Sequence, residues 1–279
     1  MSAVIGIDVG GSTTKIVGYT DEGKLISVLK VEAADPLTSA YGALGKFINE
    51  NGLSLADVKQ IILTGVGSSL FKKEVYGIPT ATVDEFKAIG LGGLALSGKE
   101  EGLIVSMGTG TAFVRAGKDG IRHIGGSGVG GGTVVGLCSK LSGATSFKTV
   151  VEKAAQGTLN HVDLNIGDIS KGVISTLTPD TTASNFGKMT DSATQEDLAL
   201  GVLNMVFQTI GMMAVFACRN DHVKDVVLTG TLTLVPCAKK VFNALYKMHG
   251  INFIIPQNAI YATATGAALS YLYESGLKK

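Results

Sequence analysis

The chain has no tryptophan, only five prolines and three cysteines, and charges that nearly cancel. A disulfide-stapled mini-protein is excluded because 279 residues can bury a large core. Cys138, Cys218 and Cys237 stand far apart, which argues against a zinc site of the Cys-x-x-Cys type. The 24 basic and 23 acidic residues give a net charge of +1, so we expect neither a general nucleic-acid surface nor a polybasic membrane patch. Disorder is excluded because 45% of the 279 residues are hydrophobic.

Segments that would direct the chain to a membrane are also missing. The opening residues MSAVIGIDVGG lack a basic stretch followed by a hydrophobic one, so no signal peptide is predicted. Residues 198–218 carry no charge and are long enough to span a bilayer, but they include Asn204, Gln208 and Thr209. We interpret this run as a buried helix, in the core or at a subunit interface. The expected location is the cytoplasm, with no membrane or nucleic-acid partner.

Glycine is the residue in excess, with 38 of 279 positions, about twice the usual share of roughly 7%. Residues 3–10, 15–20 and 25–33 are apolar and rich in β-branched side chains, and glycine-containing turns separate them. This order predicts successive antiparallel hairpins. It differs from the strand–loop–helix opening of a Rossmann or Walker unit.

The same order returns later in the chain. Residues 103–106 and 112–116 are strand-like around a glycine turn, and a third run follows the turn at 117–120. Each set is followed by helical segments and by a strand that ends in Thr-Gly, at residues 61–67 and 226–232. We therefore predict an α/β protein with two βββαβ halves around a cleft. The halves are residues 1–97 and 98–279, and the last helix can pack back on the first half.

The first glycine-rich loop has the composition of a phosphate-binding turn. Its glycines allow successive backbone amides to face anionic oxygens, and its hydroxyls add donors. The residues assigned to this contact are Gly10, Gly11, Ser12, Thr13 and Lys15. Asp8, at the end of a buried strand, is placed to hold Mg²⁺, and Lys15 to neutralise charge developing on a transferred phosphate. An ordinary hairpin turn with a solvated lysine is the alternative.

Three further glycine-containing segments are candidates for the same ligand. One repeats the logic of the first loop, one precedes an apolar helix whose N-terminus favours anions, and one ends a buried strand. The candidate contacts are, in that order, Gly108, Thr109 and Gly110; Gly130, Gly131 and Gly132; and Gly230. The alternatives are a second hairpin turn, a flexible linker and a plain strand-to-helix turn.

Together these segments resemble the superfamily of acetate and sugar kinases, heat-shock-70 proteins and actin, which are two-lobed ATPases with a ribonuclease H-like fold. More narrowly, the chain resembles type II pantothenate kinases over residues 5 to about 272. The most specific segment is SMGTGTAF at 106–113 followed by RHIGGSGVGGGTVVGL at 122–137. Further support comes from HVDLNIGDI at 161–169, TTASNFGKM at 181–189 and AIYATATGAAL at 259–269.

The resemblance implies phosphorylation of the terminal hydroxyl of pantothenate by ATP and Mg²⁺, the first step towards coenzyme A. It assigns the catalytic base to Glu85, at a strand-to-helix junction. Lys15 of the first loop, which would neutralise charge on the transferred phosphate, is the second expected catalytic residue. Asp84 is a rival for the role of base, and either carboxylate also suits a helix start. The residues expected to line the acceptor site are Thr109, Thr111, Gly126 and either Arg122 or His123.

Two positions depart from the pattern of the family. The family usually has an arginine directly before the hydrophobic residue of the Gly-Gly loop, and this arginine pairs with the pantothenate carboxylate. Here that place holds His123, and Arg122 stands one residue earlier, so in a regular strand the two face opposite sides. Either a slip or bulge of the strand delivers Arg122, or His123 is a weaker, pH-dependent cation. The second departure is Gly157-Thr158, where many relatives have Gly-Asp.

Other activities remain open on the sequence alone. An ATPase activator of a 2-hydroxyacyl-CoA dehydratase has a similar first loop, but it holds an iron–sulfur cluster through cysteine motifs that Cys138, Cys218 and Cys237 do not match. A sugar kinase, or a nucleotide-dependent sensor or filament protein without enzymatic activity, is a further alternative. The resemblance also implies a homodimer, to which residues 198–218 are expected to contribute.

Overall fold

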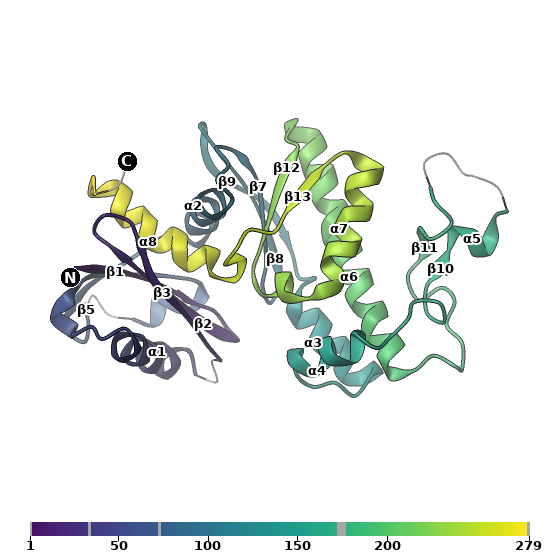
Figure 1. Ribbon diagram of the computed structural model, residues 1–279, viewed down its shortest axis with the longest axis horizontal. Helices are drawn as coiled ribbons and strands as arrows, with labels where there is room; N and C mark the ends of the chain where they lie inside the picture. Colours follow the sequence, from purple (N-terminus) through teal and green to yellow (C-terminus); the bar gives the residue numbers. More distant parts are fainter. Residues whose placement is uncertain (1, 33–34, 72–73, 172–176, 278–279) are drawn as a thin grey trace.

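The computed structural model describes residues 2–32, 35–71, 74–171 and 177–277, and these form two lobes, each built on one mixed sheet (Figure 1). In the first sheet the strand order is β3-β2-β1-β4-β6-β5, and in the second it is β13-β12-β7-β8-β9. The first sheet comprises β1 (Ala3–Val9), β2 (Thr13–Thr20), β3 (Leu25–Glu32), β4 (Val58–Thr64), β5 (Glu74–Val75) and β6 (Ile78–Thr82). The second comprises β7 (Gly102–Met107), β8 (Thr111–Gly117), β9 (Gly120–Ser127), β12 (Asp225–Thr229) and β13 (Asn252–Ile254).

The two sheets repeat one topology. Strands β1, β2 and β3 pair antiparallel in succession and β4 pairs parallel with β1, while β7, β8, β9 and β12 do the same in the second lobe. The central strands are apolar and buried along nearly their whole length, as expected for strands covered on both faces. This arrangement confirms the predicted two-lobed α/β fold with duplicated halves.

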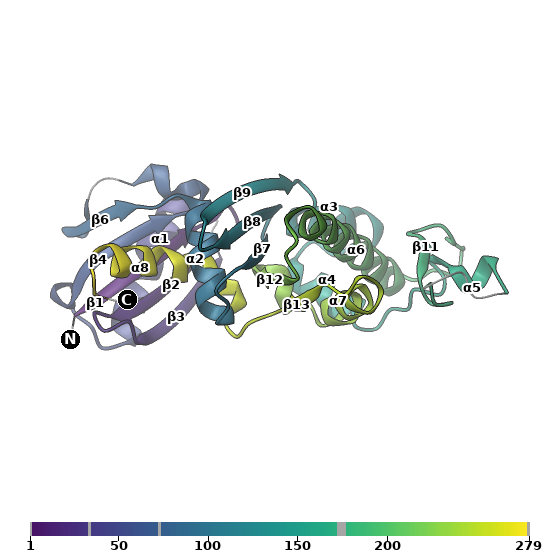
Figure 2. The same ribbon diagram turned by 90° about the horizontal axis from the view of Figure 1, so that it is seen from above.

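Helices cover both faces of each sheet. On the first sheet α1 packs on one face and α8 on the other, and on the second sheet α2 packs on one face and the long α6 on the other. The helices are α1 (Pro36–Glu50), α2 (Glu85–Ser97), α3 (Gly131–Leu141), α4 (Phe147–Ala154), α5 (Ile166–Ile169), α6 (Gln195–Asp221), α7 (Pro236–His249) and α8 (Ala262–Glu274). Figure 2 shows α2 and α8 side by side between the sheets.

The contact between α2 and α8 depends on two glycines. A Cβ atom at Gly92 would lie 1.8 Å from the carbonyl oxygen of Ala262, and one at Gly266 would lie 1.8 Å from that of Ala88. Both distances are far shorter than any van der Waals contact, so the helices can approach this closely only without side chains at these positions. The chain thereby joins its two lobes through a backbone-to-backbone helix crossing.

The uncharged run at residues 198–218 lies within α6. This helix is long and apolar enough to cross a membrane by length and composition, but 61% of its most apolar window is buried inside the protein. Its buried face packs in the core of the second lobe with Phe207 and Ile210 fully enclosed. Thr194 caps its start by accepting a hydrogen bond from the amide of Asp197. The short strands β10 (Leu164–Asn165) and β11 (Thr182–Ser184) and α5 precede α6 in the chain. They form an extension at the far end of the second lobe (Figure 1).

Candidate active site between two glycine-rich turns

The first glycine-rich loop is the tight turn between β1 and β2. Its base is closed by a hydrogen bond of 3.1 Å from the amide of Gly10 to the carbonyl oxygen of Thr13. Gly11 and Ser12 form the exposed tip. Their amides donate to no other residue in the described part of the chain. The turn therefore presents free backbone donors, as a phosphate-binding loop requires.

The second glycine-rich loop joins β7 to β8 and meets the first. The hydroxyl oxygens of Ser12 and Thr109 lie 3.5 Å apart, although 97 positions separate them in the chain. Within the described ranges, the amides of Thr109 and Gly110 also have no hydrogen-bond acceptor. Two sets of free amides and hydroxyls thus face one another from the two lobes, and both sets can donate hydrogen bonds to an anion placed between them.

A buried ion pair lies directly behind the first loop. Asp8 and Lys15 are opposite one another in the β1–β2 register, so their side chains share one face of the sheet. Lys15 Nζ lies 3.2 Å from Asp8 Oδ2, and each side chain is only 11% exposed. The alternative of a solvated lysine is excluded. The equivalent position to Asp8 in the second lobe is Ser106, since Thr64 pairs with Asp8 and Thr229 with Ser106, so the carboxylate occurs in one half of the repeat only.

The surroundings of Asp8 suit a hard cation such as Mg²⁺. Thr64, its neighbour in the parallel β1–β4 register, has a fully buried hydroxyl with no hydrogen-bond partner among the described residues. Gly65 follows in a left-handed conformation with φ +86°, and a Cβ atom there would lie 2.7 Å from Asp8 Oδ1. A carboxylate, an unsatisfied hydroxyl and space kept open by a glycine are the oxygen-rich surroundings in which Mg²⁺ and its bound waters are held.

We expect Gly65→Ala to raise the Mg²⁺ concentration needed for half-maximal activity by about tenfold, because the new methyl group would displace the Asp8 carboxylate. The positive φ would also cost about 1 kcal/mol of stability. Gly77→Ala is the matched control, since Gly77 has φ +73° with open space around it. Titration of Mg²⁺ against both variants checks the prediction, and an equal Mg²⁺ requirement would contradict it.

Glu85 and Asp84 have different roles at the start of α2. Asp84 is the N-cap, and its carboxylate accepts a hydrogen bond of 2.9 Å from the amide of Lys87. Glu85 is half-buried and has no hydrogen bond or ion pair with another described residue. Burial raises the pKa of Glu85, and the charges of Asp8 and Asp84 raise it further, while Lys15 opposes them. Glu85 is therefore a carboxylate without a described partner, and the charges of Asp8 and Lys15 influence its raised pKa.

The third and fourth glycine segments support the second loop instead of presenting free donors. The amides of Gly131 and Gly132 donate to the carbonyl oxygens of Gly108 and Thr109, at 2.8 and 2.9 Å. A Cβ atom at Gly130 would lie 2.6 Å from the carbonyl oxygen of Thr109. The amides of Gly131 and Gly132 are thus already used, and this helix end holds the second loop in place.

Gly230 has a comparable supporting position. It adopts φ +88°, a Cβ atom there would lie 2.5 Å from the carbonyl oxygen of Met107, and its amide donates to Ala259. Gly65 has nearly the same backbone angles against β1, so the two halves repeat this detail as well. Both Thr-Gly strand ends stand out in the sequence, yet neither Gly65 nor Thr64 was predicted as a site residue. The sequence feature that could have identified Thr64 and Gly65 is the internal repeat, because Thr64-Gly65 corresponds to Thr229-Gly230.

The residues expected to line the acceptor site divide into two groups. The Thr111 hydroxyl is buried and donates a hydrogen bond of 2.8 Å to the carbonyl oxygen of Val129, so its proton is already engaged within the protein. Gly126 and His123 are exposed on the side of α2, where the His123 ring stacks on Phe86. Arg122 faces away and pairs with Asp221. Phe86 was not predicted from the sequence, although it stands directly after Glu85.

The three cysteines lie in the second lobe, apart from these loops. Cys138 and Cys218 are buried in its core and Cys237 is half-buried. Burial raises the pKa of all three thiols, to about 12 for Cys218 and about 11 for Cys237. Among the described residues no group of three or more His, Cys, Asp and Glu is arranged to hold a metal ion.

Solved structures with low sequence identity share the fold. The activator of 2-hydroxyisocaproyl-CoA dehydratase from Clostridium difficile with bound ADPNP superposes with a TM-score of 0.72 at 17% identity, over 98% of this chain and 96% of that one. A ROK family glucokinase from Streptomyces griseus, in complex with glucose and AMPPNP, superposes with a TM-score of 0.64 at 12% identity, over 96% and 99% of the two chains. At these identities the likeness concerns the fold alone.

Sequence comparison is more specific. The profile of the Fumble family matches residues 102–244. The type II pantothenate kinase of Oceanobacillus iheyensis is 30% identical over 275 residues, covering 95% of this chain and 98% of that kinase. The type II pantothenate kinase of Staphylococcus aureus is 27% identical over 275 residues, covering 94% and 97%. The profile match and a relative 30% identical over nearly the whole of both chains show that the chain belongs to the type II pantothenate kinase family.

Proposed function

We propose that the enzyme transfers the γ-phosphoryl group of ATP to the terminal hydroxyl of pantothenate and forms 4′-phosphopantothenate, the first step of coenzyme A biosynthesis. The observation that carries this proposal is the meeting of the two loops, where Ser12 and Thr109 bring free amides and hydroxyls from both lobes to one point. The identity of the acceptor is inferred from type II pantothenate kinases, which are similar to this chain over nearly its whole length.

The positions of the residues support the following roles. The amides of Gly11, Ser12, Thr109 and Gly110 would hold the phosphate oxygens of ATP, because they are the unused donors of the two loops. Asp8 would hold Mg²⁺, which supplies charge neutralisation for the transferred group when bound. Lys15, released from Asp8 as the cation arrives, would then be free to meet the phosphate. Gly130, Gly131, Gly132 and Gly230 would act by keeping the second loop in shape.

Glu85 would activate the acceptor. Its carboxylate accepts the proton of the terminal hydroxyl while the alkoxide oxygen forms a bond to the γ-phosphorus, and the bond from that phosphorus to the β–γ bridging oxygen breaks. The products are the phosphorylated alcohol, ADP and the proton on Glu85. The raised pKa of Glu85 suits this role, since a more basic carboxylate accepts a proton more readily.

Identification of the product tests this function. The purified enzyme, ATP, Mg²⁺ and pantothenate should yield one new phosphate ester, and ³¹P NMR should show coupling of its phosphorus to a CH₂ group. A coupling to a single CH proton, from attack by the secondary hydroxyl, would contradict the assigned acceptor atom. No product in the presence of pantothenate, with product from another alcohol, would contradict the assigned substrate.

We also propose a cytoplasmic homodimer whose interface includes the outer faces of α3 and α6. Met205, Met212 and Phe216 recur along one side of α6 at helical spacing, and Phe216 is 55% exposed. Leu137 and Leu141 are also exposed, on α3, which packs against α6. A second copy of the same face would cover it around a two-fold axis.

Phe216→Glu is expected to shift the protein from dimer to monomer, because a carboxylate would be buried at the centre of the interface. Sedimentation velocity at micromolar concentration measures this. Leu55→Glu, on an exposed residue of the first lobe, is the control and should leave the mass unchanged. A Phe216→Glu protein that sediments as the wild-type dimer would place the interface elsewhere.

A further inference from the structure

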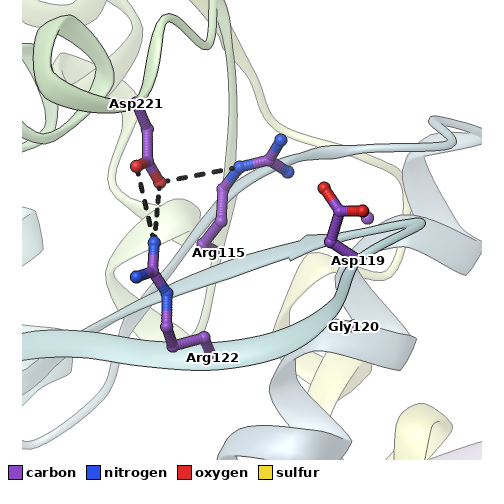
Figure 3. A pocket seen from close by; sticks show the side chains of 6 residues that line it. Arg115, Asp119, Gly120, Arg122 and Asp221 are labelled. Atoms are coloured by element: carbon purple, nitrogen blue, oxygen red, sulfur yellow. Dashed lines mark hydrogen bonds and ion pairs between the residues drawn. The ribbon is translucent and has the colours of Figure 1, made fainter.

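Strand β9 carries two basic side chains in succession, Arg122 and His123, and the structure directs them to opposite sides. Arg122 lies opposite Arg115 in the β8–β9 register, and Arg122 Nη2 lies 3.4 Å from both carboxylate oxygens of Asp221, at the end of α6. Arg115 Nε lies 3.7 Å from the same carboxylate (Figure 3). Arg122 is thus engaged on the α6 side of the sheet, away from α2 and Glu85.

Arg122 lines a pocket on this side of the sheet (Figure 3). The pocket has a volume of about 420 Å³ and is built from the turn of the β8–β9 hairpin together with the last residue of α6. Its lining residues are Arg115, Gly117, Asp119, Gly120, Arg122 and Asp221. None of them belongs to the two glycine-rich loops or to α2, so an acceptor beside Glu85 would not meet the guanidinium of Arg122.

A bulge in β9 sets the position of the second cation. Phe113 pairs with Gly125 and Val114 pairs with His123, so Ile124 is an extra residue on the β9 side. A bulge of this kind changes which side chains face each surface of a sheet. It follows the pair Arg122–His123, and therefore leaves Arg122 in register with Arg115 while His123 remains on the α2 side.

The ring of His123 is held by Phe86. The two ring centroids are 3.8 Å apart and the planes are 11° from parallel, which is a close stack. Phe86 directly follows Glu85 in α2, so the stack holds the imidazole against the helix that carries Glu85. On its other side the Nε2 atom lies 3.8 Å from where a Cβ atom of Gly126 would stand, and Gly126 has none. The nitrogen is therefore accessible and its ring is fixed.

We propose that His123, and not Arg122, is the cation that binds the carboxylate of the acceptor, and that Phe86 is the residue that positions its imidazole. This rests on the proposed function, since pantothenate carries a carboxylate at the end opposite to its reacting hydroxyl. An imidazole offers a charged donor only when it is protonated, whereas a guanidinium is always charged and binds in a bidentate manner. Acceptor binding in this enzyme is therefore pH-dependent.

Most charged groups on the elements packed around His123 are engaged elsewhere or face the other side of the sheet. Those of the neighbouring strand and helix are Asp84, Glu85, Lys87 and Arg115. Asp84 caps α2, Lys87 pairs with Glu274 at 2.7 Å, and Arg115 faces the other side of the sheet. Glu85 remains without a hydrogen bond or ion pair to another described residue, and as an anion it would repel the acceptor carboxylate from its own end of the site.

Calorimetric titration of pantothenate into the enzyme with Mg²⁺ and a non-hydrolysable ATP analogue tests the proposal between pH 5.5 and 8.5. The Kd of the wild type should rise about tenfold over this range, as a charge-assisted hydrogen bond is lost. In His123→Arg the Kd should be at least as low as the best wild-type value and change less than about twofold with pH. Pantothenol, whose carboxylate is replaced by a CH₂OH group, should show no pH dependence with either protein.

Two further variants separate His123 from its neighbours. Arg122→Ala should keep the wild-type Kd and its pH dependence, and Phe86→Leu should raise the Kd for pantothenate about threefold while the Kd for the ATP analogue stays constant. A pH-independent wild-type Kd, or a tenfold loss in Arg122→Ala, would overturn the proposal while leaving the kinase function intact. Absence of pantothenate binding at every pH would overturn the proposed function itself, and this inference with it.

Discussion

Replacing Glu85 with glutamine is expected to lower kcat for pantothenate phosphorylation by about 10²–10⁴-fold, the usual contribution of a general base. Glutamine keeps the size and the hydrogen-bonding reach of the side chain but cannot accept the hydroxyl proton. The Kd for ATP should change little, because the free amides assigned to phosphate binding lie on the two loops and not on α2. Steady-state turnover and calorimetric ATP binding measure the two quantities separately.

Asp84→Asn is the control for Glu85→Gln, because it alters the neighbouring carboxylate and asparagine is an equally good helix cap. Its turnover should stay within a few-fold of the wild type. Activity of Glu85→Gln within about threefold of the wild type would show that another group accepts the proton.

Glu85→Gln should also stabilise the protein at neutral pH. The pKa of Glu85 is raised in the folded state, mainly by burial, so its contribution to stability is fully present below the unfolded-state pKa of about 4.3 and is lost as the pH rises through the folded-state pKa. Glutamine does not titrate and loses nothing. The melting temperature of the variant should therefore exceed that of the wild type at pH 7.5, and the difference should shrink towards pH 4.

The same raised pKa of Glu85 predicts the pH dependence of kcat. Wild-type kcat should fall on the acidic side at a higher pH than an ordinary glutamate would give.

The second large effect concerns the helix crossing between the lobes. Gly266→Ala is expected to destabilise the protein by about 3 kcal/mol and to lower its Tm by roughly 5–10 °C. The methyl group would lie 1.8 Å from the carbonyl oxygen of Ala88, and neither backbone can yield without moving a helix. Because α2 carries Glu85 at its start, the displaced helix should reduce kcat as well.

Gly42→Ala is the matched control for the helix crossing. Gly42 lies in the interior of α1, and a methyl group there would have no atom within 4 Å, so alanine should be neutral or stabilise the helix by about 0.5–1 kcal/mol. Thermal unfolding of both variants gives the comparison. Equal melting temperatures for Gly266→Ala and Gly42→Ala would mean that the crossing tolerates separation of its helices.

Much of the fold could be predicted from the order of strands and turns. Short apolar runs around glycine turns predicted β1, β2 and β3, their repetition predicted β7, β8 and β9, and the uncharged run predicted the buried helix α6. The role of Gly92 and Gly266 could not be predicted, because each is an ordinary glycine in a helical segment until the other helix is placed against it. Close backbone approach between distant segments leaves no local signal.

The candidate site could be predicted only in part, because the contact between its two loops is also a contact between distant segments. The composition of the two loops led to the prediction of Ser12 and Thr109 as contacts, but only the structure shows their hydroxyl oxygens 3.5 Å apart. Glycine content alone cannot separate loops with free amides from segments such as residues 130–132, where the amides of Gly131 and Gly132 are occupied. The assignments of individual site residues remain predictions that the variants above test.

The decisive experiment for a pantothenate kinase is the rate of ADP formation by the purified protein with Mg²⁺ and ATP, measured with and without pantothenate. We expect slow ATP turnover alone and an increase of at least about 100-fold with pantothenate, because the hydroxyl proton acceptor Glu85 has a substrate only then. Equal ADP formation with and without pantothenate would contradict this activity.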